Sequence, residues 1–122
     1  MRLALESDPN IHLVRSYEGG VITIGAQQIT RPCVVSPRSL MLEWSATSVG
    51  ELTEAQLDPL LNTSANIILL GANGAPQLPS AAVRALCRAR GIALETMNLG
   101  AACRTYNILA SEDRAVAAGL FP

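Results

Sequence analysis

The fold is decided by one stretch, Asn66-Ile67-Ile68-Leu69-Leu70-Gly71-Ala72-Asn73-Gly74-Ala75-Pro76, in which an apolar run breaks into a glycine-containing loop. The four large aliphatic residues 67–70 leave no polar face, which predicts a strand covered on both sides. Gly71 and Gly74 permit backbone conformations that other residues avoid. The stretch therefore predicts a buried strand, a turn and then a helix, the start of an α/β domain.

A helix and a second strand are expected directly after this loop. Ser80 suits a helix start, residues 81–90 carry an apolar stripe, and Gly91 ends the helix. Residues 92–95 are the next strand. Residues 67–95 are therefore predicted to form one β-α-β unit with parallel strands.

The C-terminal part has one clear helical pattern and one ambiguous run. Residues 101–110 are predicted to be a helix capped by Asn98, with Ile108 facing inward and Asn107 on another side. The apolar run over residues 114–122 suits either a helix or a central strand. Periodicity alone leaves both possibilities open.

The N-terminal third has the pattern of short strands. Candidate strands at 11–17, 21–24, 27–30, 33–36 and 40–44 are separated by glycine and proline turns. They predict an antiparallel β meander over residues 11–44, within a single domain spanning 1–122 whose α/β core covers 53–121.

A short helix should link the meander to the core. Thr53 and Gln56 have the spacing of a capping box, in which each side chain bonds the other residue's backbone N–H. Pro59 removes an intrahelical hydrogen bond and is expected to kink or divide this helix.

The composition excludes several functions. Hydrophobic residues make up 49%, charged residues 16% and aromatic residues 3% of the chain, and the net charge is −1. All 9 cationic side chains are arginine, so a lysine nucleophile, a Schiff base and a P-loop lysine are excluded. Because the arginines are scattered and aromatic rings are few, no nucleic-acid partner is expected.

Metal and membrane sites are not indicated either. Cys33, Cys87 and Cys103 are widely spaced without a CxxC motif, which argues against a zinc site or a disulfide framework, and no cofactor is predicted. The N-terminus lacks the apolar core of a signal peptide, and no transmembrane segment is found. We therefore expect a reducing, cytoplasmic setting.

Several motifs together carry a family resemblance: Ile67-Ile68-Leu69-Leu70-Gly71-Ala72-Asn73-Gly74, Gly91-Ile92 followed by Glu95, and Arg104-Thr105-Tyr106-Asn107. With them the chain resembles a small superfamily of uncharacterised single-domain proteins. This superfamily includes the mitochondrial complex I assembly factor 3 and the adipogenesis-associated Mth-type domain protein.

The resemblance has implications for both fold and function. It implies a three-layer α/β fold with a central mixed sheet, a smaller antiparallel N-terminal β layer, and a C-terminal strand antiparallel to its neighbours. It also implies action through protein contacts. In that family the loop usually reads Gly-Thr-Gly, whereas here Ala72-Asn73 separates Gly71 from Gly74, so the loop is longer or differently bent.

The loop itself is the first candidate site. Gly71, Asn73 and Gly74, with Glu95 at the end of the next strand, have the arrangement in which a helix N-terminus holds phosphate and an acid holds ribose. The GxGxxG pattern is missing, however, and prolines remove donors nearby. A plain turn or a partner-facing loop is the favoured interpretation.

The second candidate is Arg104 with Tyr106, Asn107 and Glu95. An Arg104–Glu95 pair would lock the helix to the sheet, because arginine and carboxylate groups bond with specific geometry. Alternatively, Arg104 facing a cleft would hold an anionic ligand that Tyr106 and Asn107 orient. The structural lock is favoured.

For the remaining reactive side chains, a structural role is favoured over a catalytic one. His12 could be a general base, but no acid or serine partner is identified, so an edge-strand histidine is favoured. Cys87 and Cys103 could be nucleophiles, and as small buried hydrophobes they need no such role.

The sequence therefore favours a non-enzymatic, assembly-factor-like domain that binds an unidentified protein partner. The alternative is a binder or enzyme for a small anionic or nucleotide-like ligand, using the loop 71–74 with Glu95 and Arg104. The oligomeric state is not specified by the sequence.

Overall fold

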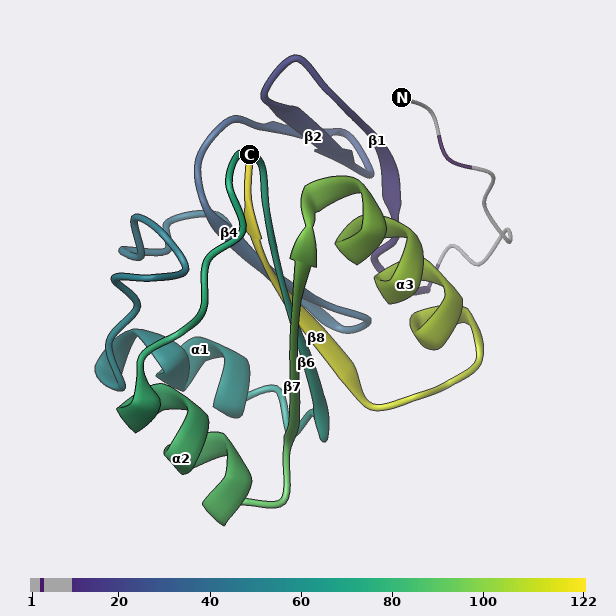
Figure 1. Cartoon of the computed structure of the whole chain (residues 1–122). Helices are drawn as coiled ribbons and strands as arrows, with labels where there is room; N and C mark the ends of the chain where they lie inside the picture. Colours follow the sequence, from purple (N-terminus) through teal and green to yellow (C-terminus); the bar gives the residue numbers. More distant parts are fainter. Residues whose placement is uncertain (1–2, 4–9) are drawn as a thin grey trace.

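The computed structural model describes residue 3 and residues 10–122, which form three layers (Figure 1). A five-stranded sheet lies in the middle, with helices on both faces and a smaller three-stranded sheet above one face. The elements are β1 (Val14–Glu18), β2 (Val21–Ile24), β3 (Gln27–Ile29), β4 (Cys33–Ser36), β5 (Ser39–Met41), the 3-10 helix η1 (Ala55–Leu57), α1 (Asp58–Leu61), β6 (Ile67–Ala72), α2 (Ala81–Ala89), β7 (Ala93–Asn98), α3 (Leu99–Ser111) and β8 (Val116–Phe121).

The central sheet has the order β5-β4-β8-β6-β7. β6 is parallel to β7 on one side and to β8 on the other. This arrangement confirms the predicted β-α-β unit and resolves the ambiguous C-terminal run as a strand. β8 is antiparallel to β4 but parallel to β6, so the expected antiparallel arrangement holds on one side only. The reason is the α3 crossover, which returns the chain to the same end of the sheet at which β6 starts.

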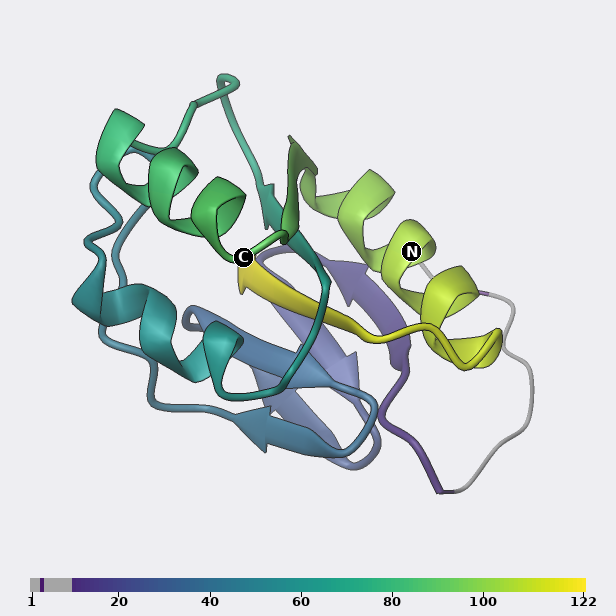
Figure 2. The ribbon, with the colours of Figure 1, turned by 90° about the horizontal axis from the view of Figure 1, so that it is seen from below.

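Both faces of this sheet are covered, which explains its unbroken apolar strands. Figure 2 shows α1 and α2 on one face of the central sheet and α3 on the other. On β6, Ile67 and Leu69 pack in the core that contains α3 and the small sheet, whereas Ile68 and Leu70 pack in the core that contains α1 and α2. The two-residue period of a strand sends alternate side chains to opposite cores. The apolar residues 67–70 therefore contribute to two hydrophobic cores, one on each face of the central sheet.

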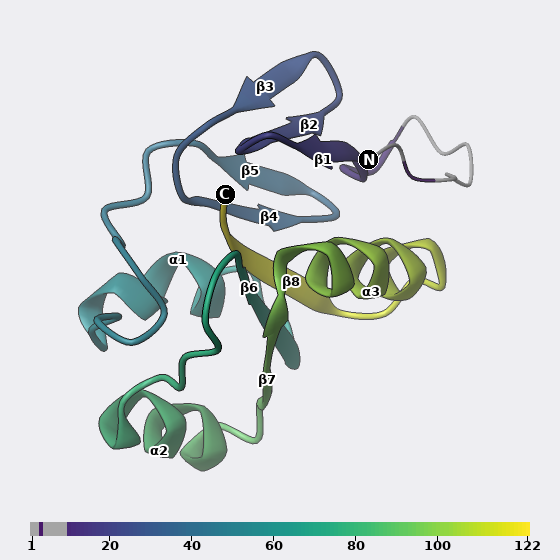
Figure 3. The same ribbon diagram turned by 45° about the horizontal axis from the view of Figure 1, so that its top comes forward.

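The N-terminal strands are divided between the two sheets, which differs from the single meander predicted over residues 11–44. β1, β2 and β3 form the small antiparallel sheet, while β4 and β5 join the central sheet beside β8 (Figure 3). All four residues of β4 are buried. A strand with no polar face needs cover on both sides, and only the central sheet provides it.

The predicted helix starts are confirmed at atomic detail. The Ser80 hydroxyl accepts a hydrogen bond from the Val83 N–H at 3.2 Å, and the Asn98 side-chain oxygen accepts one from the Ala101 N–H at 2.8 Å. These contacts satisfy backbone donors that a helix leaves unpaired.

The capping box before α1 is also present. Thr53 Oγ1 accepts from the Gln56 N–H at 3.1 Å, and Gln56 Oε1 accepts from the Thr53 N–H at 3.0 Å. Pro59 lies in the first turn of α1, and the predicted helix is divided into η1 and α1, as expected from its missing N–H.

The predicted inward face of α3 is wrong. Ile108, expected inside, is 58% exposed, whereas Asn107 is only 7% exposed. The apolar pattern predicted the wrong face because Asn107, a polar residue, occupies a core position. Its side-chain amide makes hydrogen bonds there with the backbone of β1.

Gly71 is a strand residue and not part of the loop, since β6 continues to Ala72. Its φ is not positive, unlike that of Gly74, where φ is 89°. Glycine is required at 71 because a Cβ there would overlap the Cβ of Ala102 on α3. This contact sets how closely α3 approaches the sheet.

We predict that Gly71→Ala destabilises the protein by about 1–3 kcal/mol, because the added methyl group overpacks this contact. The double variant Gly71→Ala with Ala102→Gly has the methyl group on the strand instead of on the helix, and it should recover most of that loss. Glycine inside a helix still costs about 1 kcal/mol. Urea unfolding of the wild type, both single variants and the double variant measures these differences.

The single variant Ala102→Gly is the matched control for the helix cost. If the double variant is as unstable as the sum of the two single changes, the Gly71–Ala102 contact is not what requires glycine.

Candidate functional site

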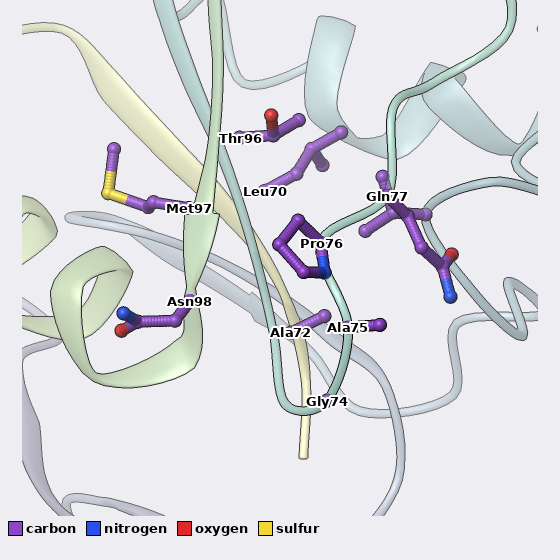
Figure 4. A pocket seen from close by; sticks show the side chains of 10 residues that line it. Leu70, Ala72, Gly74, Ala75, Pro76, Gln77, Thr96, Met97 and Asn98 are labelled. Carbon is purple, nitrogen blue, oxygen red and sulfur yellow. The ribbon is translucent and has the colours of Figure 1, made fainter.

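The sheet topology creates a crevice at the carboxyl ends of β6 and β7. The loop after β6 leads to α2 on one face, and β7 runs directly into α3 on the other. Ligand sites in open α/β sheets form where neighbouring connections diverge in this way. A crevice of about 290 Å³ lies at this point (Figure 4). Its walls are Val49, Leu70, Ala72, Gly74, Ala75, Pro76, Gln77, Thr96, Met97 and Asn98.

The walls of this crevice are uncharged. Two of its polar side chains already serve the fold: Gln77 Oε1 accepts from the Gly50 N–H at 2.8 Å, and Asn98 caps α3. In Figure 4, Asn98 points toward the start of α3, and the loop carrying Pro76 lies opposite β7. The surface left for a ligand is therefore uncharged, with apolar and polar parts of comparable size.

The first predicted site is only partly at this crevice. Gly74 lines it, Asn73 is exposed in the same loop, and Gly71 is buried beneath α3. Glu95 is exposed on β7 and is not among the lining residues. The structure thus separates the glycine loop from the acidic residue expected to act with it.

The second predicted site does not contain the expected ion pair. Arg104 is exposed and donates from Nη1 to the Tyr17 hydroxyl oxygen at 2.8 Å. Within the described ranges 3 and 10–122, no ion pair joins Arg104 to Glu95. Tyr17 was not identified from the sequence, since nothing in a separated β segment signals a contact with α3.

Tyr106 and Asn107 hold the N-terminal segment to α3. Asn107 Oδ1 accepts from the Val14 N–H at 2.9 Å, and its Nδ2 donates to the Val14 carbonyl at 2.8 Å. The Tyr106 hydroxyl donates to the His12 carbonyl at 2.7 Å, and burial raises the pKa of this hydroxyl. Residues 104–107 therefore join α3 to the segment 12–17.

The cysteines are placed as structural residues. Cys33, Cys87 and Cys103 are buried and unpaired. Burial raises the pKa of Cys33 and of Cys103 to about 12, and it raises the pKa of Cys87 as well. A thiol that keeps its proton is a poor nucleophile, so these three side chains lack the lowered pKa that activates a catalytic cysteine.

The described residues offer neither a cluster of metal ligands nor a membrane-spanning helix. They contain no group of three or more histidine, cysteine, aspartate or glutamate side chains placed to hold a metal ion. None of their helices has the length and apolar character that crossing a bilayer requires.

Sequence reasoning missed the exposed Leu78, which follows the crevice residue Gln77. Its side chain is 69% exposed, the most among the large apolar side chains of the described part. The signal was available, because Leu78 is a single leucine between polar and proline residues in a loop.

Comparison with known proteins finds one family and several solved structures of the same fold. A family model described as "Protein of unknown function (DUF498/DUF598)" matches residues 14–121. A solution structure from Xanthomonas campestris is similar at a TM-score of 0.82 and 35% identity, covering 98% of this chain and 92% of that one. A Bordetella pertussis structure described as a Mth938-like domain has a TM-score of 0.80 at 22% identity, a likeness of fold alone.

Among curated proteins, the chain is similar to the NADH dehydrogenase (ubiquinone) 1 alpha subcomplex assembly factor 3 of Danio rerio. The two are 30% identical over 112 residues, which is 90% of this chain and 64% of that protein. The human protein of the same name is 29% identical over 111 residues. The chain spans less than two thirds of the length of these relatives.

We predict that Asn107→Ala lowers the free energy of unfolding by about 2–4 kcal/mol, because the backbone N–H and carbonyl of Val14 lose their partners in a buried setting. Asn107→Leu, which keeps the volume, should be similarly destabilised. Ile108→Ala, on the exposed side of the same helix, should change stability by less than about 0.5 kcal/mol. Equal effects at positions 107 and 108 would contradict the bonding role.

We predict that the native thiols resist labelling near pH 8 and react only after unfolding.

The folded pKa of Cys33 and Cys103 lies above the ordinary value of 9.0, so their contribution to stability is complete below pH 9.0 and is lost as pH rises toward 12. Urea unfolding between pH 8 and 11 measures this loss. Cys33→Ala should make the free energy of unfolding less dependent on pH in this range. An unchanged dependence would contradict the raised pKa of the Cys33 thiol.

Proposed function

Because the chain belongs to the DUF498/DUF598 family of proteins of unknown function, we propose that it is a non-enzymatic domain that binds a protein partner, as an assembly factor does. This membership confirms the resemblance carried by residues 67–74 and 104–107. The relatives that match most of the chain are named for the assembly of NADH dehydrogenase. We propose a subunit of that enzyme as the partner and the cytoplasm as the location.

The observation that carries the proposal is the uncharged crevice between the loop 72–77 and the end of β7. Its volume of about 290 Å³ suits one or two apolar side chains of a partner. Leu78, 69% exposed at the end of this loop, adds apolar surface beside it. Protein interfaces depend on a few buried anchors that fill such pockets.

A small anionic ligand has no comparable support at this crevice. The alternative requires Glu95 and Arg104 beside the loop 71–74, and neither side chain lines the crevice. Arg104 already donates to Tyr17. A site for phosphate or carboxylate is favoured by positive charge, and no charged side chain lines the crevice.

We predict that Leu78→Asp and Ala75→Trp both reduce the assembly of NADH dehydrogenase in the cells that encode this protein. The first variant places a charge beside the uncharged crevice, and the second adds a large side chain to its wall. The gene is deleted and replaced by each variant, and assembled enzyme is measured on native gels by NADH oxidation activity. An interface anchor accounts for about a tenfold or larger loss of affinity.

The matched control is Ile108→Asp, which adds the same charge to another exposed apolar position, 58% exposed on α3. It should support normal assembly. All three variants should unfold at the wild-type urea concentration. Normal amounts of NADH dehydrogenase in the deletion strain would overturn the proposed partner, and equal effects of Leu78→Asp and Ile108→Asp would overturn the proposed surface.

A further inference from the structure

The topology brings three distant segments together at the end of the sheet opposite the crevice. The backbone N–H groups of Asn66 and Ile67 both donate to the Ala115 carbonyl, at 3.0 and 3.2 Å, which places the link into β6 beside the start of β8. β4 is antiparallel to β8, so the β4–β5 turn reaches the same place. In Figure 1 these connections lie at the end of β8 farthest from the chain terminus marked C.

These segments border a second cavity, of about 400 Å³, which is open to solvent and whose charged residues are exposed. We call it the arginine cavity, after Arg38 from the β4–β5 turn and Arg114 from the link into β8. Thr63, Ser64 and Asp113 also line it. The cavity shares no residue with the crevice at the other end of the sheet.

The charged groups of this cavity lack partners within the part of the chain that the structure describes. Neither the Arg38 guanidinium nor the Arg114 guanidinium makes a hydrogen bond or ion pair there, and the Asp113 carboxylate makes none either, although the Arg114 backbone N–H donates to the Leu109 carbonyl. Arg84 and Arg104, by contrast, donate to the Pro79 carbonyl and the Tyr17 hydroxyl. Two free guanidinium groups in one cavity provide a set of donors for a single anion.

Two residues at the cavity adopt backbone conformations that favour glycine. Ser64 has φ of 63° and Asp113 has φ of 59°, and they are the only non-glycine residues with positive φ among the described ones. Asp113 directly follows the cap of α3, a position at which glycine is common. The chain thus keeps polar side chains at the cavity despite backbone strain.

We propose that the arginine cavity binds a small organic carboxylate that also carries an amino or hydroxyl group. The planar guanidinium groups of Arg38 and Arg114 pair with the carboxylate, for which their geometry is suited. The Asp113 carboxylate accepts a hydrogen bond from the amino or hydroxyl group. Ile11, Ala65 and Val116 supply an apolar wall for the carbon skeleton.

The volume agrees with this class of ligand. A cavity of about 400 Å³ lies within the usual range for small-molecule sites. A nucleotide would demand several phosphate donors, whereas only two guanidinium groups are present and Asp113 repels additional negative charge.

Isothermal titration of the full chain at low salt tests the proposal with L-aspartate, succinate and inorganic phosphate. L-aspartate and succinate share a carbon skeleton and differ by the amino group. We expect both to bind, L-aspartate about fivefold more tightly because of the added charged hydrogen bond. No binding of either at about 10 mM, or binding of phosphate alone, would overturn the proposal.

Variants separate a specific site from general attraction to arginine. Arg38→Gln and Arg114→Gln should each weaken L-aspartate binding at least about tenfold. Arg88→Gln, at an exposed position on α2, removes the same charge away from the cavity and should leave binding unchanged. Equal losses in all three variants would overturn the site.

Asp113→Asn should bind succinate as well as the wild type does and abolish the preference for L-aspartate. Asp113→Gly should do the same while raising the melting temperature by about 2–4 °C, because glycine relieves the strained backbone. A preference for L-aspartate that survives in both variants would overturn the role of Asp113 and with it the proposed ligand class.

Discussion

The three layers depend on one buried amide. Asn107 on α3 pairs with both backbone groups of Val14, as the backbone of a neighbouring strand would. β1 is an edge strand of the small sheet, and this side chain covers the edge that β2 leaves open. Unpaired backbone groups in a core are costly, so the small sheet can pack on α3 only in the register that satisfies them. Tyr106 adds a third bond to the same segment.

This constraint also gives the distinctive sequence at residues 104–107 a structural role. Arg104, Tyr106 and Asn107 each direct a polar group at the segment 12–17. The small sheet is thereby fixed over one face of the central sheet. The crevice and the arginine cavity lie at opposite ends of the central sheet.

Strong local signals were enough to predict much of the fold. The apolar run 67–70, the capping box at Thr53 and the caps at Ser80 and Asn98 each have a local physical cause, and each is present in the structure. The misassigned features depend on distant partners. Asn107 was placed outside because its partner, Val14, lies far away in sequence, and the meander prediction could not include the pairing of β4 with β8. The crevice and the cavity likewise arise only when separate connections meet.

The position of β8 has a consequence for how the protein is made. β8 follows every other element along the chain, yet it lies between β4 and β6 and pairs with both. During synthesis, the β4–β5 hairpin and the β6–β7 pair therefore cannot join into one sheet before β8 is made. Until then, each has an unpaired apolar edge. Such edges bind other chains readily, and long-range pairing is slow. A ribosome-bound chain of this topology is exposed to aggregation until residues 116–121 emerge.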